Sequence, residues 1–492
     1  MHRRDGALGE DPLSKPVRWP SAMSLARGLC VAVILVITLV TRLHYLSAGQ
    51  LNLDEGTYWL SLRAMQAGHP LYSSVYCSQP PAFLLLTEPG WALLGGSIAA
   101  ARAVMVAWAL VGVASGAVIG WRLAGSVAGI SIAAMLAVDP MMMQQSVILQ
   151  ADGPATALGL LAVAMATCAL KGHRERARDV FAFLAGAVLV VGVLTKLLDA
   201  AVVPVVAVTL IGPRHWRRIW LLALIGGSIA GAALLLPYLP AWSALWIQVV
   251  GMHLPDSSTV GAGITFSFLA SWAHLELPEI SLAALGVLLG WRNHRRLVTT
   301  GLVWIGGALV AVAGTHPALQ HYMIAISPGL ALLGGAALAQ AAEWCGAGTH
   351  ARWTEAALVA ALVTVASIVL VGSLGNLQQL QVEPNPRQVA SIRQLIPPGS
   401  QLFGDDQFNE ALAGRQGPPY LIDTSLLRLH NSGLTPAALE SRISGDPALC
   451  GVLFATNRLT TMQGFQAWVG IHFPDRSDLP GGAVLYRRAG CA

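Results

Sequence analysis

The chain has 492 residues and a formal net charge of +5, and 55% of its residues are hydrophobic whereas only 11% are charged. An ordinary soluble domain is about 25% charged, so this composition excludes a fully water-soluble fold. The Lys and Arg residues lie in short segments between apolar runs and form no single patch, so a nucleic-acid partner is not expected.

Apolar runs of membrane-spanning length fill most of the chain. A helix that crosses the hydrocarbon core of a lipid bilayer needs about 20 apolar residues. Residues 1–375 therefore predict a mainly α-helical, polytopic transmembrane bundle of about eleven spans, at 28–46, 99–121, 124–146, 153–170, 179–194, 197–212, 217–237, 279–291, 297–314, 320–341 and 354–374.

The basic residues indicate how the bundle is oriented. If the N-terminus is cytoplasmic, the inner segments carry seventeen Lys or Arg residues, whereas the outer loops carry only Arg63 and Lys196. The first apolar run has no small-residue cleavage site after it and is interpreted as a retained helix. We expect a multi-pass protein of the cytoplasmic membrane, with the segment after about Gly375 outside the cell.

The first outer loop, residues 47–98, begins with a helix pattern that carries two adjacent acids. Asp54 suits an N-cap, Glu55 suits the first turn, and an apolar stripe follows, as expected for a helix lying along the membrane surface. Two interpretations of Asp54 are open: a helix cap worth about 1 kcal/mol, or a functional acid, since ionisable groups near a bilayer are costly to keep.

The apolar segment from Pro81 to Ser97 follows in the same loop and is interrupted by Glu88 and Pro89. Counting it as a span would place Arg122 and every later basic loop outside. We interpret it as a half-buried segment that protein must shield, with an additional pair of spans as the alternative.

Further polar residues lie at the outer ends of later spans. Asp152 precedes Gly153-Pro154 and suits either a helix start or a site acid. Lys196 lies between two outer span ends, where a lysine either reaches lipid phosphate in general or binds one phosphate specifically. His321 and Tyr322 add hydrogen-bond donors at a similar depth, although a histidine at such a boundary is more often structural.

After Gly375 the apolar runs shrink to strand length, which predicts a separate extracytoplasmic domain over residues 376–492. Helices are expected at 386–396, 406–414, 435–443 and 461–471, and strands at 400–404, 420–423, 448–456 and 482–487. This alternation predicts a small α/β layer with a largely parallel sheet. Cys450 and Cys491 lie in this domain, and the sequence leaves their pairing open.

The acids and the phosphate-binding candidates all fall at the outer membrane surface. A site there would meet a lipid-borne substrate whose head group lies at the same level. Transfer of a group from a lipid phosphate to a hydroxyl needs a carboxylate to take the acceptor proton and donors to stabilise the departing phosphate.

At these residues the chain resembles the GT-C glycosyltransferases, and among them the protein O-mannosyltransferase and aminoarabinose-transferase group, which uses polyprenyl-phosphate sugars. The resemblance covers roughly the first 345 residues and rests on an ordered set: Asp54-Glu55, Gln79-Pro80-Pro81, Asp152, Leu194-Thr195-Lys196 and His321-Tyr322 before Pro328. The C-terminal part, with GDDQFNEALAGRQGPPYLIDTSLLRL as its most suggestive stretch, resembles the extracytoplasmic tail of bacterial members.

The resemblance implies roles for particular residues. The acid matching Asp54 is implicated in catalysis and the acid matching Asp152 completes the site, with Glu55 as a further catalytic candidate. Many relatives have Lys before the Pro-Pro pair where this chain has Gln79, which brings no charge. Phosphate neutralisation would then fall to Lys196, Arg63 or Arg102.

The expected function is an inverting glycosyltransferase that moves a sugar from a polyprenyl-phosphate carrier to a glycan, lipid or protein hydroxyl outside the membrane. The leaving group is already a phosphate, so no metal or other cofactor is required, and a divalent metal has no support in the sequence. Two alternatives are a transporter or flippase of a lipid-linked sugar, which would favour ionisable residues near the bilayer midplane, and a non-catalytic scaffold that displays the α/β domain.

Overall fold

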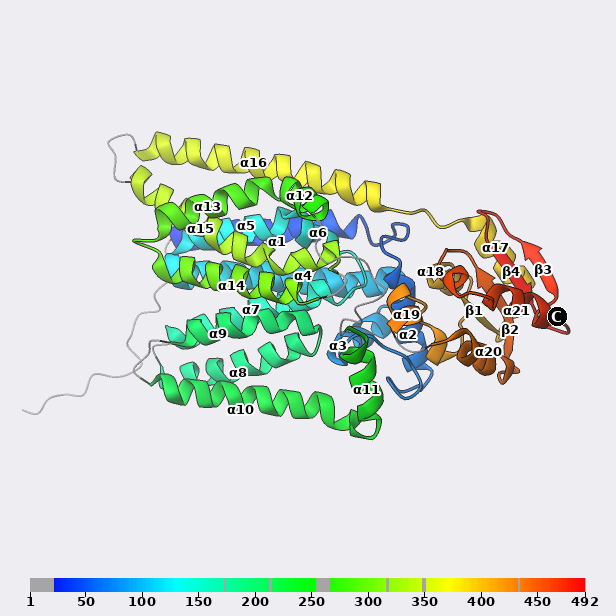
Figure 1. Ribbon diagram of the computed structural model, residues 1–492. Coiled ribbons are helices and arrows are strands. Elements are labelled where there is room, and N and C mark those ends of the chain that lie inside the picture. Colours follow the sequence, from blue (N-terminus) through cyan, green and yellow to red (C-terminus); the bar gives the residue numbers. More distant parts are fainter. Residues whose placement is uncertain are drawn as a thin grey trace, which may run out of the picture.

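A computed structural model describes residues 22–171, 174–211, 215–253, 266–315, 318–346, 351–431 and 434–491. Figure 1 shows a helical bundle with a smaller domain at one end, joined to the bundle by α16. We call this end of the bundle the domain end. Helices lie at all eleven predicted positions: α1 (Ala22–Leu43), α4 (Ile98–Ala124), α5 (Ser126–Val138), α7 (Asp152–Leu170), α8 (Glu175–Val193), η1 with α9 (Leu197–Val202 and Val203–Leu210), α10 (Trp216–Leu235), α13 (Leu277–Gly290), α14 (Arg295–Ala313), η4 with α15 (Gln320–Ala325 and Ser327–Gly346) and α16 (Ala351–Leu380).

The chain is a multi-pass membrane protein. In its described part, seven helical segments are long and apolar enough to cross a membrane, or eight if the pair α12 (Phe266–Leu275) and α13, bent by 80°, counts as one span. Large apolar side chains face outward on α1, α10 and α16; for example, Leu29, Leu224 and Val371 are 66%, 62% and 69% exposed. Such surfaces suit lipid tails rather than water. The full count of eleven stays a prediction.

Small residues let the helices of the bundle approach closely. A Cβ on Gly186 of α8 would lie 1.8 Å from the carbonyl oxygen of Ala223 on α10, and a Cβ on Gly286 of α13 would lie 1.9 Å from that of Leu333 on α15. Close backbone contact through small residues is the usual way membrane helices associate. Close packing of small residues therefore contributes to holding the helices of the bundle together.

Short elements crowd the domain end: α2 (Asp54–Gln66), α3 (Ala82–Leu93), α6 (Pro140–Gln145), η2 (Leu236–Ala241), α11 (Trp242–Val249) and η3 (Gly251–His253). Figure 1 places α2 between the bundle and the C-terminal domain, and most of its side chains are buried. That α2 lies along a membrane surface stays a prediction. Helix α3, in the segment interpreted as half-buried, packs beside α4 with Phe83 and Trp91 buried and Leu93 exposed.

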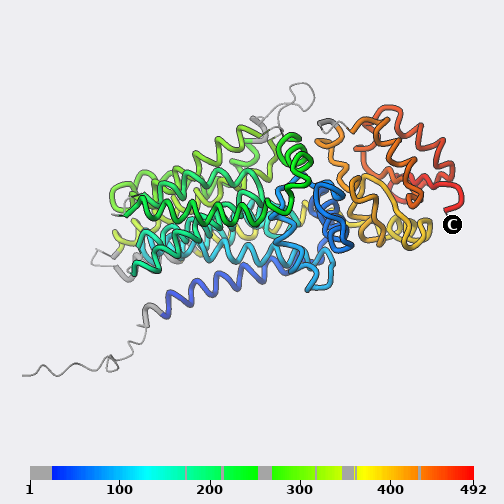
Figure 2. The backbone as a smooth tube through the Cα atoms, turned by 90° about the horizontal axis from the view of Figure 1, so that it is seen from below, coloured from blue at the N-terminus to red at the C-terminus, as the bar shows by residue number. Residues whose placement is uncertain are grey.

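The C-terminal domain contains α17 (Pro386–Leu395), β1 (Gln401–Gly404), α18 (Gln407–Leu412), η5 (Pro419–Leu421), α19 (Leu426–Asn431), α20 (Pro436–Ser444), β2 (Leu449–Phe454), η6 (Leu459–Thr461), α21 (Phe465–His472), β3 (Asp475–Asp478) and β4 (Val484–Arg487). Figure 2, which views the molecule from below, shows that this domain extends the long axis of the bundle. A disulfide joins Cys450 and Cys491, which answers the question that the sequence left open.

Two predictions about this domain are wrong. The strand expected at 420–423 is instead the short helix η5, because Pro418 and Pro419 fix a turn there and cannot donate to a sheet. The sheet has the order β1-β2-β4-β3 and only the β1–β2 pair is parallel, whereas β2–β4 and β3–β4 are antiparallel. The sheet is therefore mixed and not largely parallel.

Candidate active site

Asp54 is the first residue of α2, and its side chain is available for chemistry. The backbone N–H of Asp54 donates to Oδ1 of Asn52 at 2.8 Å, and the capping position is held by Leu53, which makes no side-chain cap bond. The interpretation of Asp54 as an N-cap is therefore wrong. Its carboxylate is half-buried, and Oδ2 accepts a hydrogen bond of 3.2 Å from Nε2 of Gln150, just before α7.

The Glu55 side chain is buried and is held by an ion pair and by backbone hydrogen bonds. Its carboxylate lies 2.7 Å from Nη2 of Arg102 in an ion pair whose side chains are both 0% exposed, and it also accepts from the N–H groups of Leu51 and Leu149. Arg102 donates as well to the carbonyls of the turn after α1, including Ala48 at 2.8 Å. The predictions that Glu55 is catalytic and that Arg102 binds phosphate do not fit this geometry. The buried ion pair instead fixes α2 on the bundle.

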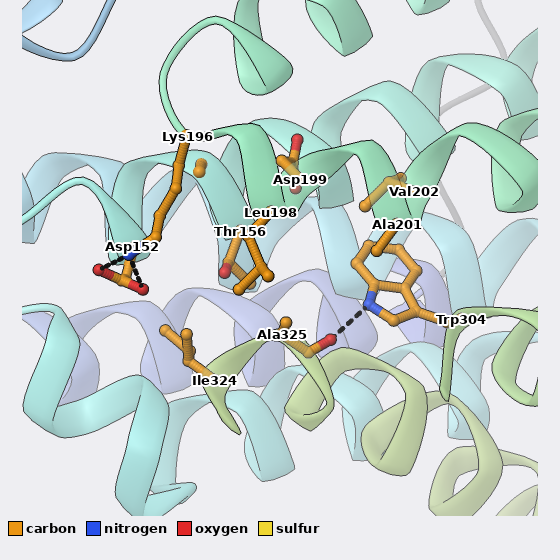
Figure 3. A pocket seen from close by; sticks show the side chains of 11 residues that line it. Asp152, Thr156, Lys196, Leu198, Asp199, Ala201, Val202, Trp304, Ile324 and Ala325 are labelled. Atoms are coloured by element: carbon orange, nitrogen blue, oxygen red, sulfur yellow. Dashed lines mark hydrogen bonds and ion pairs between the residues drawn. The ribbon is translucent and has the colours of Figure 1, made fainter. Parts of the chain in front are cut away.

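A second group of predicted residues does come together. Nζ of Lys196 lies 2.6 Å from both carboxylate oxygens of Asp152 and 4.4 Å from the centre of the Tyr322 ring, and Nε2 of His321 lies 3.9 Å from Asp152. These four residues come from the start of α7, the turn before η1, and η4. Figure 3 shows Lys196 reaching across to Asp152. An ammonium group has three N–H donors, so the two bonds to Asp152 leave one donor of Lys196 for a further partner.

The Asp152–Lys196 pair forms one end of a small cavity in the bundle, shown in Figure 3. Thr156, Asp199 and Trp304 also line it. Asp199 was not among the predicted site residues, although its carboxylate packs against two glycines, Gly159 and Gly192, at which a Cβ would lie 2.8 and 2.2 Å from its oxygens. Oδ2 of Asp199 has no hydrogen-bond partner in the part of the chain that the structure describes. A contact between an acid and glycines on other helices cannot be recognised from the local sequence.

Charges from several elements act on Asp54. Burial raises the pKa of Asp54 above its ordinary value and the nearby Asp423 raises it further, whereas Arg458, the Gln150 hydrogen bond and Lys196 lower it. Asp423 and Arg458 belong to the C-terminal domain, so sequence reasoning missed both. The phenol of Tyr58, one turn further along α2, has a pKa well above its usual range because it is buried among Asp54, Asp152 and Asp423. These groups therefore surround one site at the domain end.

The remaining predicted residues have other surroundings. Gln79-Pro80-Pro81 adjoins the turn of Lys196, because the N–H of Ala82 donates to the carbonyl of Leu194 at 2.9 Å. Within the described ranges no hydrogen bond joins the Gln79 side chain to Lys196 or Asp152. Arg63 turns away from this site and donates to the carbonyl of Ala411 in the C-terminal domain at 3.3 Å, so its predicted role in phosphate binding does not fit.

The described part of the chain contains no cluster of side chains suited to a metal ion. Over the described residues, no group of three or more His, Cys, Asp or Glu side chains is arranged to hold a metal ion. The expectation that no cofactor is required stays a prediction.

The fold and this site define a class. A long helical bundle, a first loop that carries an acid next to the first span, and a small domain after the last span together form the GT-C fold of membrane glycosyltransferases, and the resemblance seen in the sequence is confirmed. Residues 78–243 match the sequence profile of the family described as dolichyl-phosphate-mannose-protein mannosyltransferase. No curated protein sequence matches the chain significantly.

Solved structures share this fold. The crystal structure of ArnT from Cupriavidus metallidurans bound to undecaprenyl phosphate is similar with a TM-score of 0.69 and 18% identity, over 96% of this chain and 99% of that one. An oligosaccharyltransferase from Archaeoglobus fulgidus is similar with a TM-score of 0.55 and 11% identity, over 90% of this chain and 71% of that one. The mycobacterial arabinofuranosyltransferase AftD matches with a TM-score of 0.50 and 14% identity, over 88% of this chain and 35% of that one.

Proposed function

We propose that this chain is a membrane glycosyltransferase that transfers a sugar from a polyprenyl-phosphate carrier to a hydroxyl acceptor, with Asp54 as the general base. The observation that carries the proposal is that Asp54 accepts a hydrogen bond from Gln150, two residues before Asp152, whose carboxylate holds Lys196 at one end of a GT-C bundle. The ArnT structure was obtained with undecaprenyl phosphate bound, which supports a donor of this chemical class.

The chemistry is a single displacement. The acceptor oxygen attacks the anomeric carbon of the sugar while the bond from that carbon to the phosphate oxygen breaks, so the configuration inverts. The acceptor proton passes to the carboxylate of Asp54, and the electron pair of the broken bond leaves with the phosphate. A carboxylate at the position of Asp54 and a cation at the position of Lys196 serve these two needs separately.

Asp152 holds the cation in place. Both of its oxygens lie 2.6 Å from Nζ of Lys196, and with its side chain only 2% exposed it is screened little by solvent. The pair is close to neutral by itself, so an incoming phosphate must compete with Asp152 for the ammonium group. The Tyr322 ring over the ammonium group adds a cation–π contact that the phosphate does not displace.

We also propose that the site faces outward from the cytoplasmic membrane. Helices α8, α10 and α14 begin at the end of the bundle away from the C-terminal domain (Figure 1), and each carries two Arg residues in its first turn. An excess of Lys and Arg marks cytoplasmic loops. The domain end would then meet a lipid carrier whose sugar is presented outside. The acceptor, whether a glycan, a lipid or a protein hydroxyl, would approach from the same side.

The proposal is tested by transfer with the purified protein in lipid vesicles, supplied with a panel of polyprenyl-phosphate sugars and hydroxyl acceptors. We expect release of polyprenyl phosphate together with a product of inverted anomeric configuration. Movement of a lipid-linked sugar across the vesicle membrane without any transfer or hydrolysis would instead favour the transporter alternative.

A further inference from the structure

The C-terminal domain is docked on one face of α2, the helix that begins with Asp54. A Cβ on Gly56 would lie 2.2 Å from the backbone nitrogen of Phe408, so only a glycine allows α18 this close. Trp59 meets the Phe408 ring edge-on at 6.0 Å between centroids, and Arg63 donates to the carbonyl of Ala411. Gly56, Trp59 and Arg63 follow helical spacing, so one continuous stripe of α2 carries the domain.

A second contact joins the domain to the first outer loop. The guanidinium of Arg428 lies 3.7 Å from the centre of the Tyr76 ring and 4.9 Å from that of Tyr420, and the two rings meet edge-on. Arg428 also donates to the backbone carbonyls of Asp423 and Tyr420. The segment that carries Asp423 is therefore fastened both to its own domain and to the loop before α3.

Two charged residues are held near the site by this docking. Asp423 is buried, and its Oδ1 accepts from the N–H of Ser425 at 2.8 Å, which orients the carboxylate. Arg458 is also buried; it donates to the carbonyl of Asp405 and to Oε1 of Gln407, the residue before Phe408. The position of Arg458 thus follows from the same α18 contact that rests on Gly56, and Thr424, the neighbour of Asp423, accepts a hydrogen bond from Nε2 of Gln407 at 2.6 Å.

We propose that Asp423 and Arg458 are positioning residues that the C-terminal domain contributes to the site around Asp54, so that docking of the domain sets the charges that surround the base. This inference rests on the proposed function and deepens it. It gives the domain a part in the chemistry rather than only a role as a cover or an acceptor-binding module.

Electrostatic interactions connect the docked domain to Asp54. The charged groups that act on Asp54 are Asp423 and Arg458 from the domain and Lys196 from the bundle, and Gln150 is hydrogen-bonded to it. The charge of Asp54 acts in turn on the phenols of Tyr58 and Tyr322. Asp423 raises the pKa of Asp54 and Arg458 lowers it. Removing the acid should therefore let Asp54 ionise at lower pH, and removing the guanidinium should make it ionise at higher pH.

The test uses the full-length protein in lipid nanodiscs. Carbodiimide labels protonated carboxyl groups, so mass spectrometry of the Asp54 peptide across pH gives the midpoint of its ionisation without any need for activity. Asp423→Asn keeps the acceptor oxygen for Ser425, and we expect its midpoint to move down by about half a pH unit or more. Arg458→Gln should move the midpoint up by a similar amount, whereas Arg458→Lys should stay near the wild type.

Asp406→Asn is the matched control. Asp406 is a neighbouring acid of the domain that caps α18 through the N–H of Asn409, and asparagine keeps that cap. Asp406 is not among the charged residues that shift the pKa of Asp54. The ionisation midpoint of Asp54 in Asp406→Asn should therefore equal that in the wild type. Where transfer is measured, the acid limb of the pH profile of transfer should move with the labelling midpoint of Asp54 in each variant.

Opposite shifts in Asp423→Asn and Arg458→Gln support the inference, and equal midpoints in all variants overturn it. Loss of folding would itself move the midpoint down, because it removes the burial that raises the pKa of Asp54, so the upward shift in Arg458→Gln is the result that misfolding cannot produce. A failure of the proposed function has a different signature: Asp54→Asn would then retain transfer while the labelling midpoints still shifted.

Discussion

Replacing Asp54 by asparagine separates a base from a structural residue. Asparagine has nearly the same shape, and its side-chain oxygen still accepts from Gln150, so the hydrogen bond that the carboxylate makes among the described residues is kept. The amide cannot take a proton from an attacking hydroxyl. Loss of a general base lowers rates by about 10²–10⁴, and we expect transfer to fall by at least ~10², which corresponds to about 2.7 kcal/mol in the activation free energy.

The same variant should not be less stable. Burial raises the pKa of Asp54 in the folded state, so folding favours the protonated form, and the ionised carboxylate opposes folding at any pH above its unfolded pKa. Asparagine removes that cost at neutral pH, and the unfolding temperature in detergent should be equal to or above that of the wild type. Because the pKa is raised, the acid limb of the wild-type transfer profile should lie above the ordinary aspartate value of about 4.

The control is Asn52→Ala. It removes the side-chain acceptor for the N–H of Asp54 at the start of α2 but leaves the carboxylate in place. Loss of such a bond costs about 1 kcal/mol of stability, so this variant should unfold earlier and still transfer sugar. Full transfer by Asp54→Asn, or loss of both stability and transfer in both variants, would refute the assignment of Asp54 as the base.

Four further outcomes are expected. Lys196→Ala should mainly raise the KM for the lipid donor in the transfer assay, because it removes the cation and leaves the base. Arg102→Ala should lower the free energy of unfolding by about 3–5 kcal/mol, because it leaves the buried Glu55 carboxylate without its cation; thermal unfolding would measure this loss. Gly56→Ala should loosen the C-terminal domain, seen as faster limited proteolysis, because the added Cβ meets the backbone of α18. In intact cells, a membrane-impermeant thiol reagent should label Ala437→Cys in the domain and not Glu175→Cys at the start of α8.

Most of the helical architecture could be predicted because it depends on local composition. Each predicted span coincides with a helical segment, since a long apolar run has few other ways to satisfy its backbone hydrogen bonds in lipid. The antiparallel pairing of β4 with β2 could not be predicted, because strand direction depends on chain connections rather than on the strand itself. Strand β3 (Asp475–Asp478) was missed because its sequence, DRSD, is polar and lies at a sheet edge.

The candidate site was predictable only in part. Asp152, Lys196 and Tyr322 were chosen because each lies at the predicted outer end of a span, and helix ends at one depth of a bundle come together. The burial of Glu55 against Arg102 was not visible, because the two residues are 47 positions apart and either could equally have faced a substrate. The reach of Asp423 toward Asp54 depends on how a separate domain docks, which no local pattern encodes.

One turn of α2 explains why the acidic motif has the residues that it has. Asp54 faces the site, Glu55 is clamped to the bundle by Arg102, and Gly56 leaves room for α18. Because consecutive helical residues point about 100° apart, these three positions must face three different neighbours. Changes at them should therefore fail in three distinguishable ways: loss of transfer at Asp54, loss of stability at Glu55, and loss of domain docking at Gly56. If docking sets the charge on the base, the change at Gly56 should also move the pH dependence of transfer, which neither a cap nor a simple cover over the site would do.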